Sequence, residues 1–182
     1  MPSRRVLMVA LAASFVLMPG GPDPASGSTF RRMSDEELVR QSLLVVDVKV
    51  VSTVSIWNTD HTQIHTLVDL DILDFVKGDL PAGRRTLRLR ILGGVVGDMA
   101  MTVIGAPQFR AGERSLLFLR PACERLGFPL VSPVQGREPA VMDGRTGKLM
   151  APLRGVEYSQ LLGDLRKTVA RVTQPPVPAP NR

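Results

Sequence analysis

The chain has 182 residues, of which 44% are apolar, 22% are charged and 4% are aromatic, with one cysteine and a formal net charge of +6. This composition favours one globular domain over a repeat array, a disordered chain or a disulfide scaffold. It does not identify a reaction, so the remaining inferences depend on the order of the residues.

The first 27 residues have the pattern of an export signal. Arg4 and Arg5 precede an uncharged apolar run over 6–18, which ends at a segment rich in proline and glycine. The run is shorter than the roughly 20 apolar residues that a membrane-spanning helix needs, so a permanent anchor is the less favoured alternative. Residues 1–27 are therefore predicted to be a signal peptide. The mature protein is predicted to be exported, either periplasmic or secreted, without a stable membrane span.

A short helix is predicted before the first strand. Ser34 lies three residues ahead of Glu37, and this spacing forms a capping box in which each side chain satisfies the other residue's backbone N–H. Acidic residues in the first turn also suit the helix dipole. We therefore predict that residues 28–43 form an N-terminal segment with a helix that begins at Asp35 and ends near Leu43.

Two long antiparallel strands are predicted next, joined by a short polar loop at 57–60. Apolar side chains recur at every second position, so the even-numbered side chains from Val46 to Ile72 are predicted to face a common core. The solvent-facing side of the first strand is then predicted to carry Asp47, Lys49, Thr53 and Ser55. The apolar phase slips between Ile72 and Leu73, which predicts a β-bulge there.

A third strand is predicted over 86–92, with its leucines facing the core and Arg88 and Arg90 facing solvent. Its register is predicted to place Asp69 opposite Arg90 and Asp71 opposite Arg88. Glycines then predict a sharp corner. Shorter strands are predicted near 99–103, 115–119 and 128–134, followed by a small hairpin over 141–150.

Helical spacing returns at 154–173, where Tyr158 and several leucines share one face. Residues 174–182 are rich in proline and are predicted to be a disordered tail. Together the elements predict a mainly β protein: a small antiparallel β-barrel over 44–153, with a short N-terminal helix and a C-terminal helix packed on the barrel. A sandwich is the alternative. Closure into a barrel is favoured because it accounts for the long first hairpin and for the glycine-rich corner.

Four segments occur in a familiar order over about 44–134: VVDVKVVSTVSIWN, LVDLDILDFVKGDLP, LRLRILGG and GAPQFRAGERSLLFL. This order resembles uncharacterised secreted bacterial proteins whose pattern looks like the oligonucleotide/oligosaccharide-binding (OB) barrel of netrin modules and tissue inhibitors of metalloproteinases. The resemblance implies an OB-like barrel that presents loops to a partner. Those inhibitors act through a disulfide-tied N-terminal cysteine. The chain has no cysteine before Cys123, so their inhibitory mechanism is not implied.

Residue types needed for metal binding or catalysis are scarce. His61 and His65 have a spacing that suits zinc on a helix, whereas they are predicted to lie in a loop and on a strand. No Gly-x-Ser-x-Gly elbow occurs, and the glycine-rich run 93–97 lacks the Lys-Ser/Thr pair of a phosphate-binding loop. Cys123 is predicted to be a small apolar filler, with an intermolecular disulfide as the alternative. We therefore predict that the protein is not an enzyme and uses no metal or cofactor.

Two functions then remain for an exported, non-catalytic protein. One is contact with a protein partner, an exported protease among the candidates, or with a cell-envelope component, through the first hairpin loop. The predicted contact residues are Trp57, Asn58, Asp60 and His61. The alternative is binding of a polyanion, either an anionic glycan or a nucleic acid, through Arg84, Arg85, Arg88 and Arg90. Export and the few aromatic residues disfavour nucleic acid. Neutralisation of the arginines by neighbouring aspartates is the competing interpretation of this patch.

Overall fold

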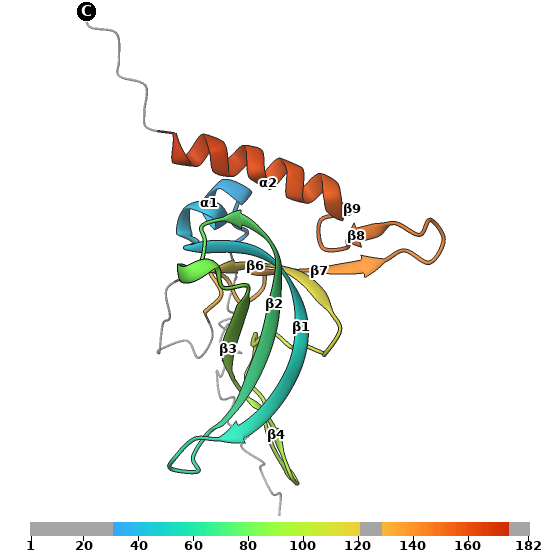
Figure 1. Ribbon diagram of the computed structural model, residues 1–182. Coiled ribbons are helices and arrows are strands. Elements are labelled where there is room, and N and C mark those ends of the chain that lie inside the picture. Colours follow the sequence, from blue (N-terminus) through green and yellow to red (C-terminus); the bar gives the residue numbers. More distant parts are fainter. Residues whose placement is uncertain (1–30, 121–128, 175–182) are drawn as a thin grey trace, which may run out of the picture. The chain divides into compact units, whose positions relative to one another are not determined.

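The computed structural model of the protein describes residues 31–120 and 129–174 (Figure 1). The predicted signal peptide, Cys123 and most of the predicted tail lie outside the described residues. In chain order the elements are α1 (Asp35–Gln41), β1 (Leu44–Trp57), β2 (Ile64–Lys77), the 3-10 turn η1 (Pro81–Gly83), β3 (Thr86–Leu92), β4 (Gly94–Val96), β5 (Met99–Met101), β6 (Arg114–Leu119), β7 (Arg137–Met142), β8 (Leu149–Ala151), β9 (Val156–Glu157) and α2 (Tyr158–Thr173). Among the described residues, no helix has the length and hydrophobicity needed to cross a membrane.

Seven strands form one antiparallel sheet in the order β3-β2-β1-β6-β7-β8-β9, and β4 and β5 form a separate hairpin. The prediction of a mainly β protein with a short helix before the strands and a longer helix after them is confirmed. Within the described residues the sheet is not a closed barrel, because its edge strands β3 and β9 do not pair. Strand β9 has only two residues and continues directly into α2, so it offers no ladder on which β3 could close.

Both predicted helices are present. The Ser34 hydroxyl accepts the N–H of Glu37 at 3.2 Å, and the Glu37 carboxylate accepts the N–H of Ser34 at 2.8 Å, so the predicted capping box is confirmed. Helix α1 ends earlier than predicted, because Ser42 is extended and its N–H caps the last carbonyl groups. Helix α2 begins later than predicted, because residues 154–157 contain a turn and β9.

A β-bulge in β1 reverses the two faces of that strand. Val51 is an extra residue, because the residues on either side of it pair with consecutive residues of β2. Beyond the bulge, Val54 and Ile56 lie on the outer face and are 55% and 40% exposed. Thr53 and Ser55 lie on the inner face instead. The predictions for these four side chains are wrong. The alternation of apolar residues along the strand does not show where an extra residue is inserted, and every side chain beyond that residue points to the opposite face.

The bulge predicted in β2 is confirmed. Leu73 is the extra residue there, because its two neighbours pair with the consecutive residues Asp47 and Val48 of β1. Its side chain is exposed. Bulges bend a strand and increase its twist, which helps β1 and β2 to curl around a shared core.

The register of β2 against β3 differs from the prediction by two residues. Asp69 and Asp71 lie opposite Arg88 and Thr86, rather than opposite Arg90 and Arg88. A shift of two keeps every side chain on its predicted face, so the apolar pattern alone cannot detect it. The observed register lets Arg88 donate from Nε and Nη2 to the two carboxylate oxygens of Asp69, at 2.6 and 3.0 Å.

The shorter strands that were predicted are present with one exception, and the short strands β4 and β9 were not predicted. The described part of the predicted strand at 128–134 is reduced to a single bridge between Leu130 and Leu119. Pro129 and Pro133 have no N–H to donate, so a longer ladder cannot form. The buried strand β6 and the β7–β8 hairpin are present where they were predicted.

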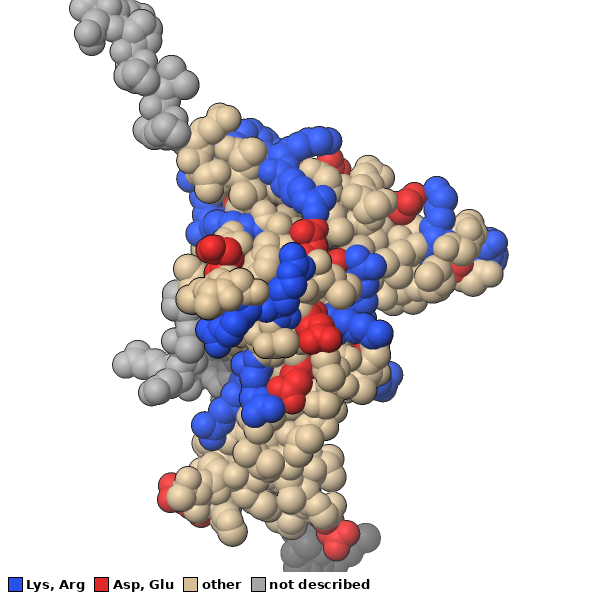
Figure 2. Space-filling model, in the orientation of Figure 1, with Lys and Arg blue, Asp and Glu red and all other residues tan. Residues whose placement is uncertain are grey.

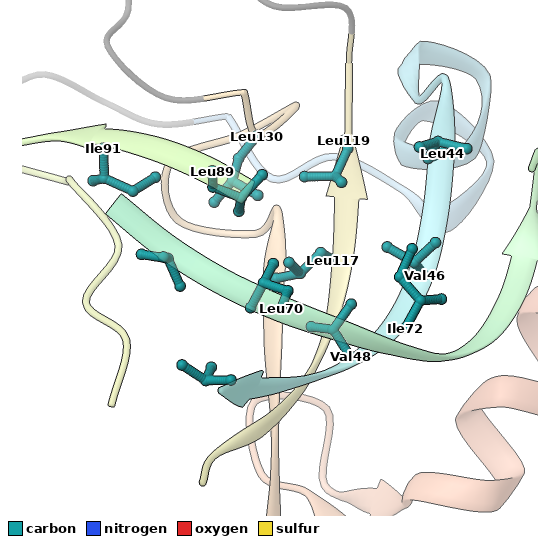
Figure 3. Packing of buried hydrophobic residues seen from close by; sticks show 12 residues of the cluster. Leu44, Val46, Val48, Leu70, Ile72, Leu89, Ile91, Leu117, Leu119 and Leu130 are labelled. Atoms are coloured by element: carbon teal, nitrogen blue, oxygen red, sulfur yellow. The ribbon is translucent and has the colours of Figure 1, made fainter. Parts of the chain in front are cut away.

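Two clusters of buried apolar side chains pack against the sheet, an inner cluster on one face and an outer cluster, beneath the helices, on the other. Figure 3 shows the inner cluster, in which Leu89 of β3 and Leu130 take part together although their segments are not neighbours in the sheet. The sheet therefore curls around this cluster, whose buried members are Leu44, Val46, Val48, Val50, Val68, Leu70, Ile72, Leu89, Ile91, Leu117, Leu119 and Leu130. The outer cluster contains the apolar faces of α1 and α2, and its buried members are Leu38, Val39, Val45, Val76, Leu116, Phe118, Val131, Ala151, Tyr158, Leu161, Leu162 and Leu165.

Asp47 is buried beneath α2, although it was predicted to face solvent. Arg114 of β6 donates to both of its carboxylate oxygens, from Nε at 3.1 and 3.2 Å and from Nη2 at 2.5 Å. The Tyr158 hydroxyl donates to the same carboxylate at 2.8 Å. Burial raises the pKa of Tyr158, and the charge of Asp47 raises it further, so this hydroxyl stays protonated. The prediction is wrong because α2 covers this end of the outer face.

Candidate functional site

We call the end of the sheet formed by residues 51–68 and 91–109 the tip. It comprises the β1–β2 loop, the adjoining strand ends and the β4–β5 hairpin, in which β4 packs against β1 and β2. Only Asp60 and Asp98 are charged in these two segments, whereas 22% of the whole chain is charged. Figure 2 shows the same segregation, since Lys and Arg gather on the rest of the face that is drawn and leave the tip largely uncharged.

Asn58 holds the β1–β2 loop in shape. Its N–H donates to the carbonyl oxygen of Gln63 at 2.8 Å, and its Oδ1 accepts the N–H groups of Thr62 and Gln63 at 2.8 and 2.9 Å. Its Nδ2 donates to the Thr62 hydroxyl at 2.9 Å. Because both ends of the carboxamide are engaged within the loop, Asn58 has a structural role rather than that of a contact residue.

The loop brings Trp57 and His61 together. Their ring centroids are 6.0 Å apart, with the ring planes at 39°. His61 adopts the left-handed backbone conformation, with φ of 53°, which turns the chain back toward β2. Asp60 and His61 are exposed and Trp57 is half-buried. All four predicted contact residues are therefore at least partly accessible at the tip, but only Asn58 has its side chain used within the loop.

Sequence reasoning missed a set of exposed apolar side chains in the two segments of the tip. Val54 and Ile56 lie on the outer face of β1, and Val95 and Met99 of the β4–β5 hairpin are 63% and 59% exposed. Apolar side chains that are exposed together often mark a contact surface. The sequence signal was the scarcity of charge in both segments. This scarcity of charge does not by itself predict a contact surface, because nothing in the sequence indicates that the two segments lie at the same end of the sheet.

His65 lies on the outer face of β2, opposite Ile56 of β1 and Leu92 of β3. Its side chain is buried, and its Nδ1 has no hydrogen-bond partner among the described residues. Burial lowers the pKa of His65, and the positive charge of Arg90 lowers it further. The folded protein therefore keeps His65 neutral at a pH at which His65 of the unfolded chain already begins to take up a proton.

This arrangement predicts a loss of stability in mild acid. Because the folded pKa of His65 lies below the ordinary value of 6.5, the unfolded chain binds more protons just below that pH, and the free energy of unfolding falls there. Urea unfolding between about pH 7.5 and about pH 5 measures the effect. The decline is expected to be smaller in His65→Leu than in the wild type. His61→Leu is the control for replacing a histidine at the tip, and equal declines in the wild type and His65→Leu would refute the prediction.

The arginines of the predicted polyanion patch are not equivalent. Arg88 binds Asp69, and its hydrogen bonds hold the pKa of that carboxyl below the usual value. Arg85 donates to carbonyl groups near the end of β2, at 3.2 and 3.4 Å. Arg84 and Arg90 are exposed and have no ionic partner among the described residues. Arg84 and Arg90 are therefore available to an external anion, and Arg85 keeps its positive charge but has Nη1 committed to carbonyl groups.

Within the described ranges, no group of three or more His, Cys, Asp or Glu side chains is placed to hold a metal ion. No protein family, curated protein or solved structure matches the chain. Any functional conclusion must therefore come from the geometry of the tip and from the sequence itself.

Proposed function

We propose that the protein is an exported, non-catalytic binding protein that contacts a protein partner or a cell-envelope component through the tip. One observation carries this proposal: the tip is almost uncharged, and both of its segments expose apolar side chains, Val54 and Ile56 in one and Val95 and Met99 in the other, besides the paired rings of Trp57 and His61. Tryptophan is frequent among the residues that dominate binding energy in protein interfaces, methionine is enriched there, and charged side chains are depleted at interface centres.

Export and an OB-like arrangement are parts of the same proposal. The basic and apolar pattern of residues 1–27 supports export. The curl that brings Leu89 and Leu130 into one cluster supports a barrel-like arrangement of the strands over 44–153, as does the resemblance to netrin modules and tissue inhibitors of metalloproteinases. Such barrels often use the loops at one end for binding, which agrees with a contact surface at the tip.

The experiment compares the mature chain with single lysine variants of exposed strand valines. Immobilised protein is exposed to periplasmic or secreted extract and washed in about 1 M salt, where electrostatic interactions reach only about 3 Å. A bound partner is expected to remain on the wild type. Val54→Lys and Val95→Lys are expected to weaken its binding at least about tenfold, because a charge would be buried in an apolar contact.

Val141→Lys is the matched control, since Val141 is also an exposed valine of a strand but lies in the β7–β8 hairpin outside the tip. It is expected to bind the partner as the wild type does. A partner that binds all three variants equally would contradict a contact at the tip.

Polyanion binding is the second candidate, and the exposed, unpaired state of Arg84 and Arg90 within the described residues favours it. Heparin serves as the probe. If this function holds, heparin affinity falls steeply as salt rises, and Arg84→Gln and Arg90→Gln each weaken it. Arg88→Gln is the comparison variant, because Arg88 is already neutralised by Asp69. If heparin binds weakly and neither Arg84→Gln nor Arg90→Gln changes its affinity, this candidate function is excluded.

A further inference from the structure

A half-open cavity of about 380 Å³ lies at the tip, on the inner face of the sheet. Its floor consists of Thr53, Ser55, Thr66, Val68 and Ile91, from the ends of β1, β2 and β3. Its walls consist of residues 92–95, 100–103 and 106–110. Small-molecule sites in proteins usually have volumes of about 300 to 1,000 Å³, so this cavity has room for a small ligand.

The inner face of the sheet changes character at this cavity. Inner positions deeper in the sheet carry valine, leucine and isoleucine, whereas Thr53, Ser55 and Thr66 place hydroxyl groups on the floor. The bulge at Val51 turns two of these three hydroxyls inward. Hydroxyl groups at positions that a closed core would fill with apolar side chains are typical of a site that is polar at one point and apolar around it.

Two of the three hydroxyls are already committed. Thr66 Oγ1 donates to the carbonyl oxygen of Gly93 at 2.7 Å, so its single proton is used and Ser55 must donate to Thr66 across 3.0 Å. The N–H of Val95 in turn donates to Ser55 Oγ at 3.4 Å. This chain of hydrogen bonds fixes β4 above the floor. On the floor of the cavity, the Thr53 hydroxyl has no partner among the described residues.

The remaining lining limits the charge of a ligand. Among the described residues that line the cavity, none is acidic, and the charged Arg110 and the polar Thr102 and Gln108 are exposed to solvent. Ile91, Met101 and Phe109 supply apolar surface. We propose that the cavity binds a small uncharged molecule with an apolar body and one hydroxyl group, and that this hydroxyl bonds to Thr53.

Two matched probes test the proposal: 2-phenylethanol, and ethylbenzene, which lacks the hydroxyl. Methyl NMR of the full mature chain follows saturable shifts at Val68, Ile91 and Val103. Thr53→Val keeps the shape of the side chain and removes its hydroxyl, so it is expected to weaken 2-phenylethanol roughly three- to tenfold and to leave ethylbenzene unchanged. Thr86→Val is the control, because Thr86 is exposed on β3 and does not line the cavity.

A second variant tests the place of binding. Ala106 lines the cavity, and Ala106→Leu adds bulk there, so both probes are expected to lose saturable binding. If both probes bind Ala106→Leu as they bind the wild type, or if neither probe binds the wild type saturably, the proposal that the cavity is a binding site is wrong. Equal affinity of 2-phenylethanol for the wild type and Thr53→Val would overturn the role of Thr53. These variants leave Val54 and Val95 intact, so the result is independent of the partner contact proposed above.

Discussion

Replacing Asp47 with alanine is expected to lower the free energy of unfolding by about 3 kcal/mol. The Asp47 carboxylate is buried and accepts hydrogen bonds from Arg114 and Tyr158, which belong to β6 and α2. Its removal leaves a half-buried cation and a buried hydroxyl without an acceptor, and such groups cannot recover their lost hydration. The loss is expected at the lower end of the range for buried pairs, because the Arg114 side chain is 38% exposed.

Chemical unfolding of Asp47→Ala and Asp71→Ala gives the comparison. Asp71 lies on the same face of the sheet but is exposed, so its replacement is expected to change stability by at most about 0.5 kcal/mol. The double variant Asp47→Ala, Arg114→Met is expected to recover part of the loss, because it removes the stranded charge together with its partner. Equal effects of the two single substitutions would show that Asp47 contributes no more than a surface carboxylate.

The position of Asp47 illustrates what periodicity in the sequence can and cannot reveal. Alternation identified β1, β2 and β3 and the buried side of β1 as far as Val50, and the capping pattern identified α1, because these features depend on residues close in sequence. Asp47 sits on the polar side of that alternation, so it was predicted to be exposed. Only the packing of α2, more than 100 residues away, makes it buried. Contacts of that range leave no local pattern.

Two of the register shifts between β1 and β2, at Leu73 and at Val51, show the same limit from another side. Leu73 was predicted as a bulge because the apolar phase shifts visibly there. The bulge at Val51 was not predicted, because Val51 directly follows another valine and the residues on either side of it can occupy the core face or the solvent face. The missed bulge matters for function, since it exposes Val54 and Ile56 and turns Thr53 and Ser55 toward the cavity.

The contact residues of the tip were predictable only in part. A polar loop with a tryptophan indicated the right hairpin, and the structure adds that Asn58 is used within the loop. The exposed Val95 and Met99 belong to a segment that is distant in sequence and reaches the same end of the sheet through β3. Predicting that arrangement requires the sheet order and register, and the register was wrong by two residues.

Replacing Gly94 with alanine is expected to destabilise the protein by about 3 kcal/mol and to abolish binding of 2-phenylethanol in the cavity. Gly94 has φ of +142°, a conformation that side-chain-bearing residues rarely adopt. A Cβ atom there would lie 2.4 Å from Ser55 Oγ and 2.5 Å from Thr66 Oγ1. Either the two hydroxyls must rotate or strand β4 must move away from the sheet, and both changes break the hydrogen-bond chain that holds the cavity wall.

Gly97→Ala separates the effect of crowding from that of backbone conformation. Gly97 also has positive φ, at +57°, but a Cβ atom there would meet no atom of the described residues within 4 Å. Its replacement is expected to cost about 1 kcal/mol of conformational strain and to leave ligand binding intact. Unfolding and the methyl NMR titration, applied to both variants, measure the difference. If Gly94→Ala were no more harmful than Gly97→Ala, the close approach of β4 to Ser55 and Thr66 would not be what shapes the cavity.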